Sequence, residues 1–121
     1  MKIKFKEIET HEWDEFHNLH KIVAGKSTRS SDTWNIQKKN ILNGSGLLIY
    51  FTKEKKLISG SYFDVSKDDI KYSVSVTKDD YFHLNCNHKS IYEAIKFGKK
   101  NKKSNIYLGH LNDNEQDIKV K

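Results

Sequence analysis

The chain has 121 residues, a net charge of +6 and one cysteine, which excludes an internal disulfide and is typical of a reducing compartment. Apolar residues make up 36% of the composition, enough for the small core of one domain. No stretch has the pattern of a signal peptide, a membrane-spanning helix or a zinc site. We therefore expect a cytoplasmic protein without a metal or a membrane span, whose basic charge suits an anionic partner.

The N-terminal part of the chain predicts one strand and two helices. Apolar residues alternate with charged ones over residues 2–8, as in a short strand. A helix is expected from an N-cap at Thr10 to a stop at Gly25, and a second one over residues 31–42. One face of the first helix carries Trp13, Phe16, Leu19, His20 and Val23.

The middle of the chain predicts three consecutive antiparallel strands. Residues 46–52 form a continuous apolar run, and residues 57–65 and 70–77 alternate apolar with polar positions across short polar turns. Strict alternation places Tyr72 and Ser75 on opposite faces of the third strand. At most one of these two side chains is then expected to face a cleft.

The C-terminal part predicts a helix and a short strand. Residues 78–87 have no regular pattern, and a helix is expected to begin at His88 or Ser90. Residues 106–108 predict a short buried strand, and a polar tail follows from Asn112. The order of elements indicates an α+β domain, in which a mixed, largely antiparallel sheet carries helices on both faces.

The segment between the first two helices is the most distinctive in the chain. It reads LHKIVAGKSTRSSDTWNIQ over residues 19–37 and places Arg29 and Ser30 in a loop rich in hydroxyl groups. A guanidinium beside a helix start suits a carboxylate or a phosphate, and Trp34 and Gln37 follow one turn apart. The alternative is an ordinary capped helix with a solvated arginine and a tryptophan in the core.

The order of elements resembles the GNAT acyltransferase fold, and the residues resemble its FemAB-like branch, the Fem-type peptidyltransferases and their GNAT-like relatives. The matching stretches cover most of residues 17–109 and read LHKIVAGKSTRSSDTWNIQ, ISGSYF, IKYSVSVTKDDYF, HKSIYEAIKFGKK and IYLG. The pattern is that of the C-terminal lobe of proteins at least twice as long. The resemblance implies that residues 1–121 are one lobe, either truncated at its C-terminal end or a reduced relative of the longer proteins. Such a lobe is expected to need a missing GNAT-like lobe or a dimer partner and to be inactive or weak alone.

The resemblance also implies a reaction, the transfer of an acyl or aminoacyl group to an amine, as in cell-wall peptide or surface-glycan biosynthesis. Acyl-CoA, an acyl-carrier thioester or aminoacyl-tRNA would be the donor substrate, with no resident cofactor. Members that use acetyl-CoA have a glycine-rich loop before a helix N-terminus, whereas residues 81–90 read YFHLNCNHKS. The missing glycine is expected to disfavour direct binding of CoA.

The candidate catalytic residues are two histidines, His20 and His88, because an imidazole can accept a proton near neutral pH. A packed structural histidine is the alternative for each of them. The expected substrate-binding residues are Arg29, Ser30, Trp34, Gln37 and Tyr72. The resemblance further predicts that the loop over residues 25–31 and the helix start at His88 open onto one cleft.

A second class of function stays open, a small basic module that binds nucleic acid or a protein partner without catalysis. Its basis is a lysine cluster near the end of the last helix, at Lys96, Lys99, Lys100, Lys102 and Lys103. Cations are also favoured at a helix C-terminus by the helix dipole. A solvated helix end is therefore the alternative to a phosphate-binding patch.

Overall fold

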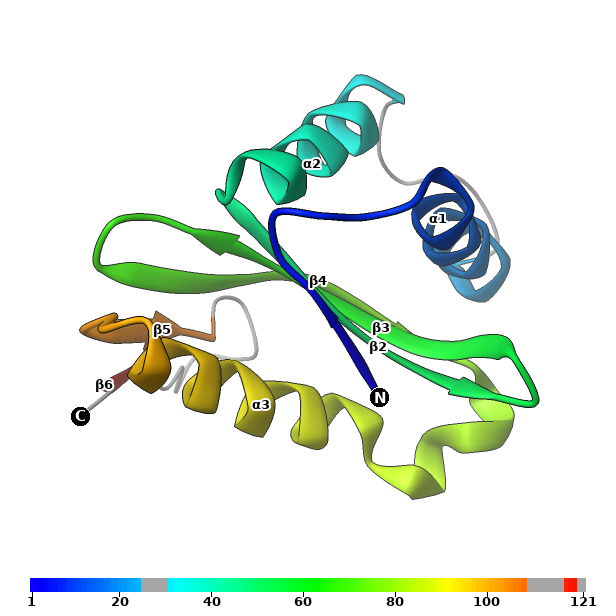
Figure 1. Ribbon diagram of the computed structural model, residues 1–121. Helices are drawn as coiled ribbons and strands as arrows, with labels where there is room; N and C mark the ends of the chain where they lie inside the picture. Colours follow the sequence, from blue (N-terminus) through cyan, green and yellow to red (C-terminus); the bar gives the residue numbers. More distant parts are fainter. Residues whose placement is uncertain (25–30, 109–116, 120–121) are drawn as a thin grey trace.

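A six-stranded sheet separates two layers of helices in the computed structural model, which describes residues 1–24, 31–108 and 117–119 (Figure 1). Helices α1 and α2 cover one face of the sheet, and α3 covers the other. The elements follow in the order β1 (Lys2–Lys4), α1 (Thr10–Ala24), α2 (Ser31–Asn43), β2 (Gly46–Lys53), β3 (Lys56–Val65), β4 (Asp69–Thr77), a 3-10 helix (Asp79–Leu84), α3 (Cys86–Lys100), β5 (Asn105–Tyr107) and β6 (Asp117–Lys119). The expected α+β class, with helices on both faces of a mixed sheet, is confirmed.

The strands lie in the sheet in their sequence order, from β1 to β6. The expected antiparallel meander is confirmed, because β2 pairs with β3 and β3 with β4 in antiparallel register. Strands β4 and β5 are parallel and pair over three positions only, from Asp69 opposite Asn105 to Lys71 opposite Tyr107. The rest of β4, residues 72–77, has no partner strand on that side in the described part of the chain.

Two apolar cores form, one on each face of the sheet. Strand β2 contributes to both cores, because Leu48 and Tyr50 face α1 and α2 whereas Leu47 and Ile49 face α3. This double burial explains the continuous apolar run in its sequence. The α1 and α2 side is rich in aromatic rings in mutual contact, namely Trp13, Phe16, Trp34 and Tyr62.

A buried carboxylate joins the start of α1 to β1 and β2. The carboxylate of Glu12 accepts hydrogen bonds from the Tyr50 hydroxyl and from the backbone N–H of Glu9, at 3.1 Å for the latter, and lies 3.2 Å from the Lys4 ammonium. Burial alone would raise the pKa of Glu12, but these three partners outweigh it and the pKa is lowered. Burial and the neighbouring carboxylate raise the pKa of Tyr50 well above its ordinary value.

The element boundaries differ from the sequence-based expectations in four places. Strand β1 ends at Lys4, and α3 begins at Cys86 rather than at His88 or Ser90. The segment expected to be irregular contains a 3-10 helix, and part of the expected polar tail, residues 117–119, pairs with β5 as β6. Strand pairing between distant segments is not a property of either segment alone, so the sequence of a polar tail does not show it.

None of the helices that the structure describes is long and apolar enough to cross a membrane.

Candidate functional site

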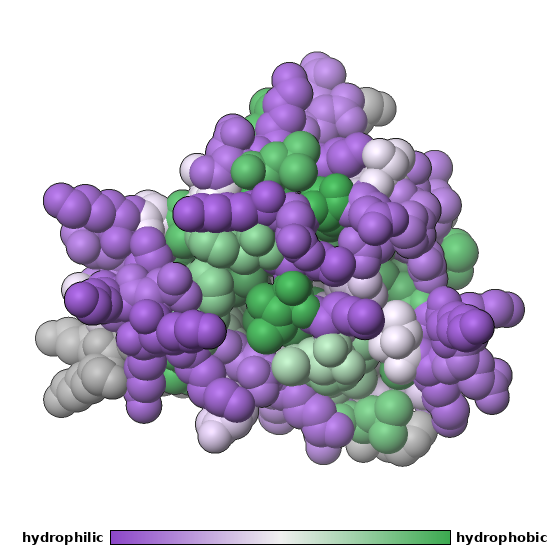
Figure 2. All heavy atoms as spheres, in the orientation of Figure 1, coloured by the Kyte–Doolittle hydropathy of each residue, from purple (hydrophilic) through white to green (hydrophobic). Residues whose placement is uncertain are grey.

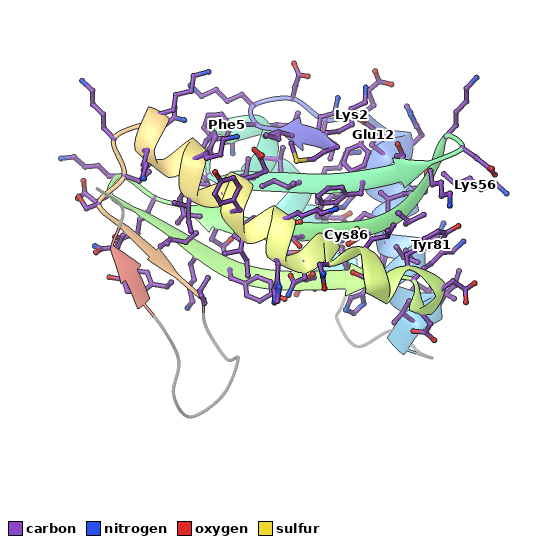
Figure 3. All side chains as sticks on the ribbon, turned by 90° about the horizontal axis from the view of Figure 1, so that it is seen from below. Lys2, Phe5, Glu12, Lys56, Tyr81 and Cys86 are labelled. Carbon is purple, nitrogen blue, oxygen red and sulfur yellow. The ribbon has the colours of Figure 1, made fainter. Side chains whose placement is uncertain are left out.

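A pocket of about 380 Å³ lies where the end of α1, the unpaired part of β4 and the start of α3 meet. Figure 3 labels Cys86, the first residue of α3, which lies over the sheet on this side of the molecule. The residues that line the pocket come from three separate segments and are Val23, Tyr72, Ser75, Val76, Thr77, Asn85, Cys86, Asn87 and His88. Two of the predicted site residues, Tyr72 and His88, therefore lie on one pocket.

A β-bulge in β4 shapes this pocket. Along β3, Tyr62 lies opposite Val74 and the next residue, Phe63, lies opposite Tyr72, so that Ser73 is an extra residue on β4. An extra residue reverses the alternation of side chains beyond it. Tyr72 accordingly packs against the core on the α3 side, whereas Val74 belongs to the core on the other side.

The bulge overturns the expectation that Tyr72 and Ser75 point to opposite faces. Both side chains line the pocket, because they are three residues apart with the extra residue between them. A bulge depends on the pairing of two strands, and regular alternation cannot reveal it. Bulges are common beside functional sites, where they redirect a side chain.

A row of hydroxyl groups forms the sheet surface beneath the start of α3. Ser59 lies within hydrogen-bond distance of Thr77, at 2.8 Å between the oxygens, and Ser61 lies 3.0 Å from Ser75. The Ser75 hydroxyl donates to the side-chain oxygen of Asn87 at 3.1 Å. These bonds fix the first turn of α3 onto the central strands and give the pocket a polar wall.

The N-terminus of α3 is open toward the pocket. Its N-cap residue, Asn85, makes no side-chain capping bond, and no acidic residue stands in the first turn. The helix has 15 residues, so its N-terminal backbone N–H groups carry the positive end of a substantial helix dipole. Such an end, with no carboxylate among the residues that line the pocket, favours an anion such as a phosphate.

The turn before α3 is left-handed, although it contains no glycine. Asn85 has φ 54° and ψ 38°, in the region that asparagine enters more readily than most residues. A glycine is therefore unnecessary for the chain to turn into α3. The expectation that the missing glycine disfavours CoA concerns the approach of a pyrophosphate to the backbone N–H groups, and it stays a prediction.

Tyr72 and His88 supply groups that can exchange protons at the pocket. Tyr72 is half-buried, and burial raises the pKa of its hydroxyl, which the neighbouring Ser75 hydroxyl partly opposes. The phenol therefore stays protonated at neutral pH and can donate a proton or a hydrogen bond. His88 is exposed in the first turn of α3, where its imidazole can accept one.

The predicted residues on α1 and α2 lie elsewhere. Trp34 and Gln37 are only 2% and 6% exposed, and neither lines the pocket. His20 packs against Trp34 with 5.4 Å between the ring centres. Because Trp34 and Gln37 are three residues apart, they share the helix face that packs on the sheet, which favours a packing role for Trp34.

Arg29, Ser30 and the rest of the loop over residues 25–30 lie outside the described residues. The chain enters this loop from the end of α1, where Val23 lines the same pocket as His88. Val23 and His88 thus lie on one pocket, and the predicted common cleft of the loop and the start of α3 stays a prediction. The contribution of Arg29 and Ser30 to it stays a prediction.

The lysine cluster has structural roles at the end of α3. The Lys103 ammonium donates to the backbone carbonyls of Ser66 and Lys67, at 2.6 Å and 3.0 Å, and Lys96 lies 3.3 Å from a carboxylate oxygen of Glu93. The Lys103 bonds tie the segment after α3 to the turn before β4, whereas the Lys96–Glu93 pair lies within α3. Within the described residues, no group of three or more His, Cys, Asp or Glu side chains could hold a metal ion.

The polar pocket residues that sequence reasoning missed were Thr77, Asn85, Cys86 and Asn87. A signal for Thr77 existed in the hydroxyl residues that alternate with valine in SVSVT, residues 73–77. Small hydroxyl side chains at interior positions of a central strand indicate a polar surface beneath a helix. The other three residues lie around a turn whose conformation the sequence pattern did not indicate.

His17, on the α1 face toward α2, makes the stability of the protein depend on pH. Its ring stacks on Trp34 with 4.3 Å between ring centres. Burial lowers the pKa of His17 below 6.5, and repulsion from Lys21 lowers it further. Attraction to Asp14 raises the pKa, but by less than the two other effects lower it. The folded state then binds fewer protons than the unfolded state, so stability is full above the unfolded pKa and falls as the pH decreases through about 6.5. We expect the urea midpoint to fall less between pH 7.5 and 5 in His17→Gln than in the wild type. An equal fall of the urea midpoint between pH 7.5 and 5 in the two proteins would contradict the prediction.

Solved structures of N-acetyltransferases share this fold. The ribosomal-protein-S18-alanine N-acetyltransferase from Escherichia coli superposes with a TM-score of 0.73 at 13% identity, over 93% of this chain and 69% of its own. An acetyltransferase of the GNAT family from Staphylococcus aureus Mu50 gives a TM-score of 0.69 at 16% identity, over 89% of this chain and 73% of its own. The chain therefore has the GNAT fold.

An aminoglycoside 6'-N-acetyltransferase complexed with coenzyme A is also similar, with a TM-score of 0.68 at 12% identity over 89% of this chain. The chain spans only 61% of the length of that enzyme. At the level of sequence, no family model and no curated protein matches the chain.

Proposed function

We propose that this chain is an N-acyltransferase lobe that moves an acyl group from a thioester donor, above all acyl-CoA, to an amine and releases the free thiol. The observation that carries the proposal is the pocket where the uncapped N-terminus of α3 meets the unpaired part of β4 in a GNAT fold. The helix end suits the pyrophosphate of the donor. The strand edge offers backbone N–H and C=O groups to the amide-bearing arm of the donor.

Tyr72 and His88 can supply the two proton transfers that aminolysis of a thioester requires. The amine nitrogen attacks the thioester carbonyl, the C–N bond forms, and the C–S bond breaks with its electron pair passing to sulfur. Tyr72, held protonated by the raised pKa of its phenol, donates a proton to the leaving sulfur. His88, on the same pocket, accepts a proton from the amine, and each transfer lowers the barrier only if it is positioned for the transition state.

The resemblance to FemAB-like proteins adds detail to the proposal about the donor, the acceptor and a second lobe. It keeps acyl-carrier thioesters and aminoacyl-tRNA as alternative donors, and cell-wall peptides or surface glycans as the setting of the acceptor amine. It also implies that a second lobe or a dimer partner completes the active site. The assay therefore compares the three donors, each with the chain alone and with a partner lobe joined to it.

The proposal is tested first by binding, since binding needs no acceptor. Calorimetric titration of the chain with CoA should show a single saturable site. Pantetheine, which lacks the pyrophosphate, should bind at least about tenfold more weakly, the equivalent of 1.4 kcal/mol. If CoA shows no saturable binding, or pantetheine binds equally well, the assigned role of the α3 N-terminus is wrong.

Tyr72→Phe is expected to lower kcat on the order of 10²-fold, the usual lower range for the loss of a general acid. The phenyl ring keeps the packing against the α3-side core, so the affinity for CoA should change little. Tyr92→Phe is the matched control, because Tyr92 is 63% exposed on the same side of the sheet. Release of free thiol from the donor in the presence of an amine measures the rate. An unchanged kcat in Tyr72→Phe would remove Tyr72 from the reaction.

A further inference from the structure

A second hollow lies between β1 and the C-terminal half of α3 and has a volume of about 560 Å³. Its walls are apolar, formed by Ile3, Phe5 and Phe97, and its rim carries Glu93, Lys96 and Lys100. Figure 2 shows apolar side chains gathered in the middle of this face, with hydrophilic side chains around them. We call this hollow the β1–α3 groove.

Aromatic rings form part of the wall of the β1–α3 groove. Phe5 and Phe97 meet edge to face, with 4.9 Å between ring centres, and Figure 3 shows Phe5 beside the C-terminal half of α3. Both rings are half-buried, and Ile3 is 40% exposed. A ligand with an apolar body would remove this surface from water, which favours binding.

The rim of the groove has a surplus of positive charge. Lys96 and Lys100 are four residues apart and therefore lie on the same side of α3. Lys96 is 3.3 Å from a Glu93 carboxylate oxygen, whereas Lys100 has no ion pair within the described part of the chain. The rim thus carries two ammonium groups and one carboxylate, and this surplus of positive charge favours a further anionic group.

The groove and the acyl-transfer pocket are separate. They share no lining residue and lie at opposite ends of α3. His88 and Lys100 are 12 residues apart on this helix, which is about 18 Å at 1.5 Å per residue. A ligand in the groove would therefore leave the pocket accessible to its own substrates.

We propose that the β1–α3 groove binds an amphipathic carboxylate of the size of a medium-chain fatty acid. Its chain would lie along Ile3, Phe5 and Phe97, and its carboxylate would pair with Lys100. The volume is within the range of small-molecule sites, which combine apolar walls with a few polar groups that orient the ligand. The lysines disfavour a cationic amphiphile, and the aromatic walls disfavour a fully hydrated anion.

The test is a titration of the full chain with sodium decanoate, followed by amide chemical shifts in NMR spectra. Saturable shifts are expected at residues 3–5 and 93–101, and at least tenfold weaker binding for decyltrimethylammonium and for butyrate. Lys100→Glu and Ile3→Gln should each weaken decanoate binding at least tenfold. Both positions are exposed, so neither change removes a core contact. Lys39→Glu, the same charge change at an exposed site in α2, is the control and should leave binding unchanged.

Equal binding of decanoate and decyltrimethylammonium, or equal affinity in Lys100→Glu and Lys39→Glu, would overturn the proposal. Two further outcomes would assign the groove to another occupant. One is a dimer in sedimentation that Ile3→Gln dissociates, and the other is binding to anionic vesicles without binding of free decanoate. CoA should leave the groove shifts unchanged, so this test does not depend on the proposed acyl transfer.

Discussion

Replacing Gly60 by alanine is expected to lower the free energy of unfolding by about 1–3 kcal/mol, the usual range for overpacking a filled core. A Cβ atom at this position would lie 2.6 Å and 2.8 Å from two carbons of the Phe16 ring. That ring is fully buried and in contact with Trp13 and Trp34, so it cannot withdraw. Urea unfolding followed by circular dichroism measures the change.

The control for this prediction relieves the clash from the other side. Phe16→Leu removes the ring atoms of α1 that the new methyl group at position 60 would meet. The double variant with Gly60→Ala and Phe16→Leu should therefore lose less free energy of unfolding than the sum of the losses in the two single variants. Coupling is the expected signature of residues in contact. Strict additivity, or a Gly60→Ala variant as stable as the wild type, would show that α1 does not approach β3 as closely as described.

Asn87→Asp is expected to change stability and donor affinity in opposite directions. A carboxylate in the first turn of α3 should stabilise the helix by about 0.3–1 kcal/mol through the helix dipole. The Ser75 hydroxyl can still donate to it, as it does to the Asn87 side-chain oxygen at 3.1 Å. The same negative charge lies on the wall of the proposed pyrophosphate site, so CoA should bind at least about tenfold more weakly, or 1.4 kcal/mol.

Asn18→Asp is the matched control, since Asn18 is exposed on α1 and does not line the pocket. It makes the same chemical change and should leave CoA affinity unaltered. Calorimetry gives the affinities, and urea unfolding gives the stabilities. Equal CoA affinity in Asn87→Asp and Asn18→Asp would show that the donor does not bind at the start of α3. Added salt should reduce the difference between them if the effect is electrostatic.

The sequence alone determined the order of the strands and α-helices from β1 to β5 and the antiparallel meander of β2, β3 and β4. Both follow from the periodicity of apolar residues, which records the local burial of each segment. The continuous apolar run of β2 indicated that this strand is buried on both faces. The GNAT fold was expected from a resemblance, and the superpositions confirm the fold. Of the candidate site, Tyr72 and His88 were named from the sequence, and the structure brings them to one pocket.

The tertiary structure decided what each of these residues faces. The bulge at Ser73 turns Ser75 to the side of Tyr72, and it arises from the register between β3 and β4, which neither strand encodes by itself. The left-handed conformation of Asn85 permits the turn into α3 without glycine, and burial of Trp34 follows from packing against α1 and the sheet. Such properties depend on contacts between segments far apart in the chain, so a local pattern can place a residue on an element but cannot show what lies opposite it.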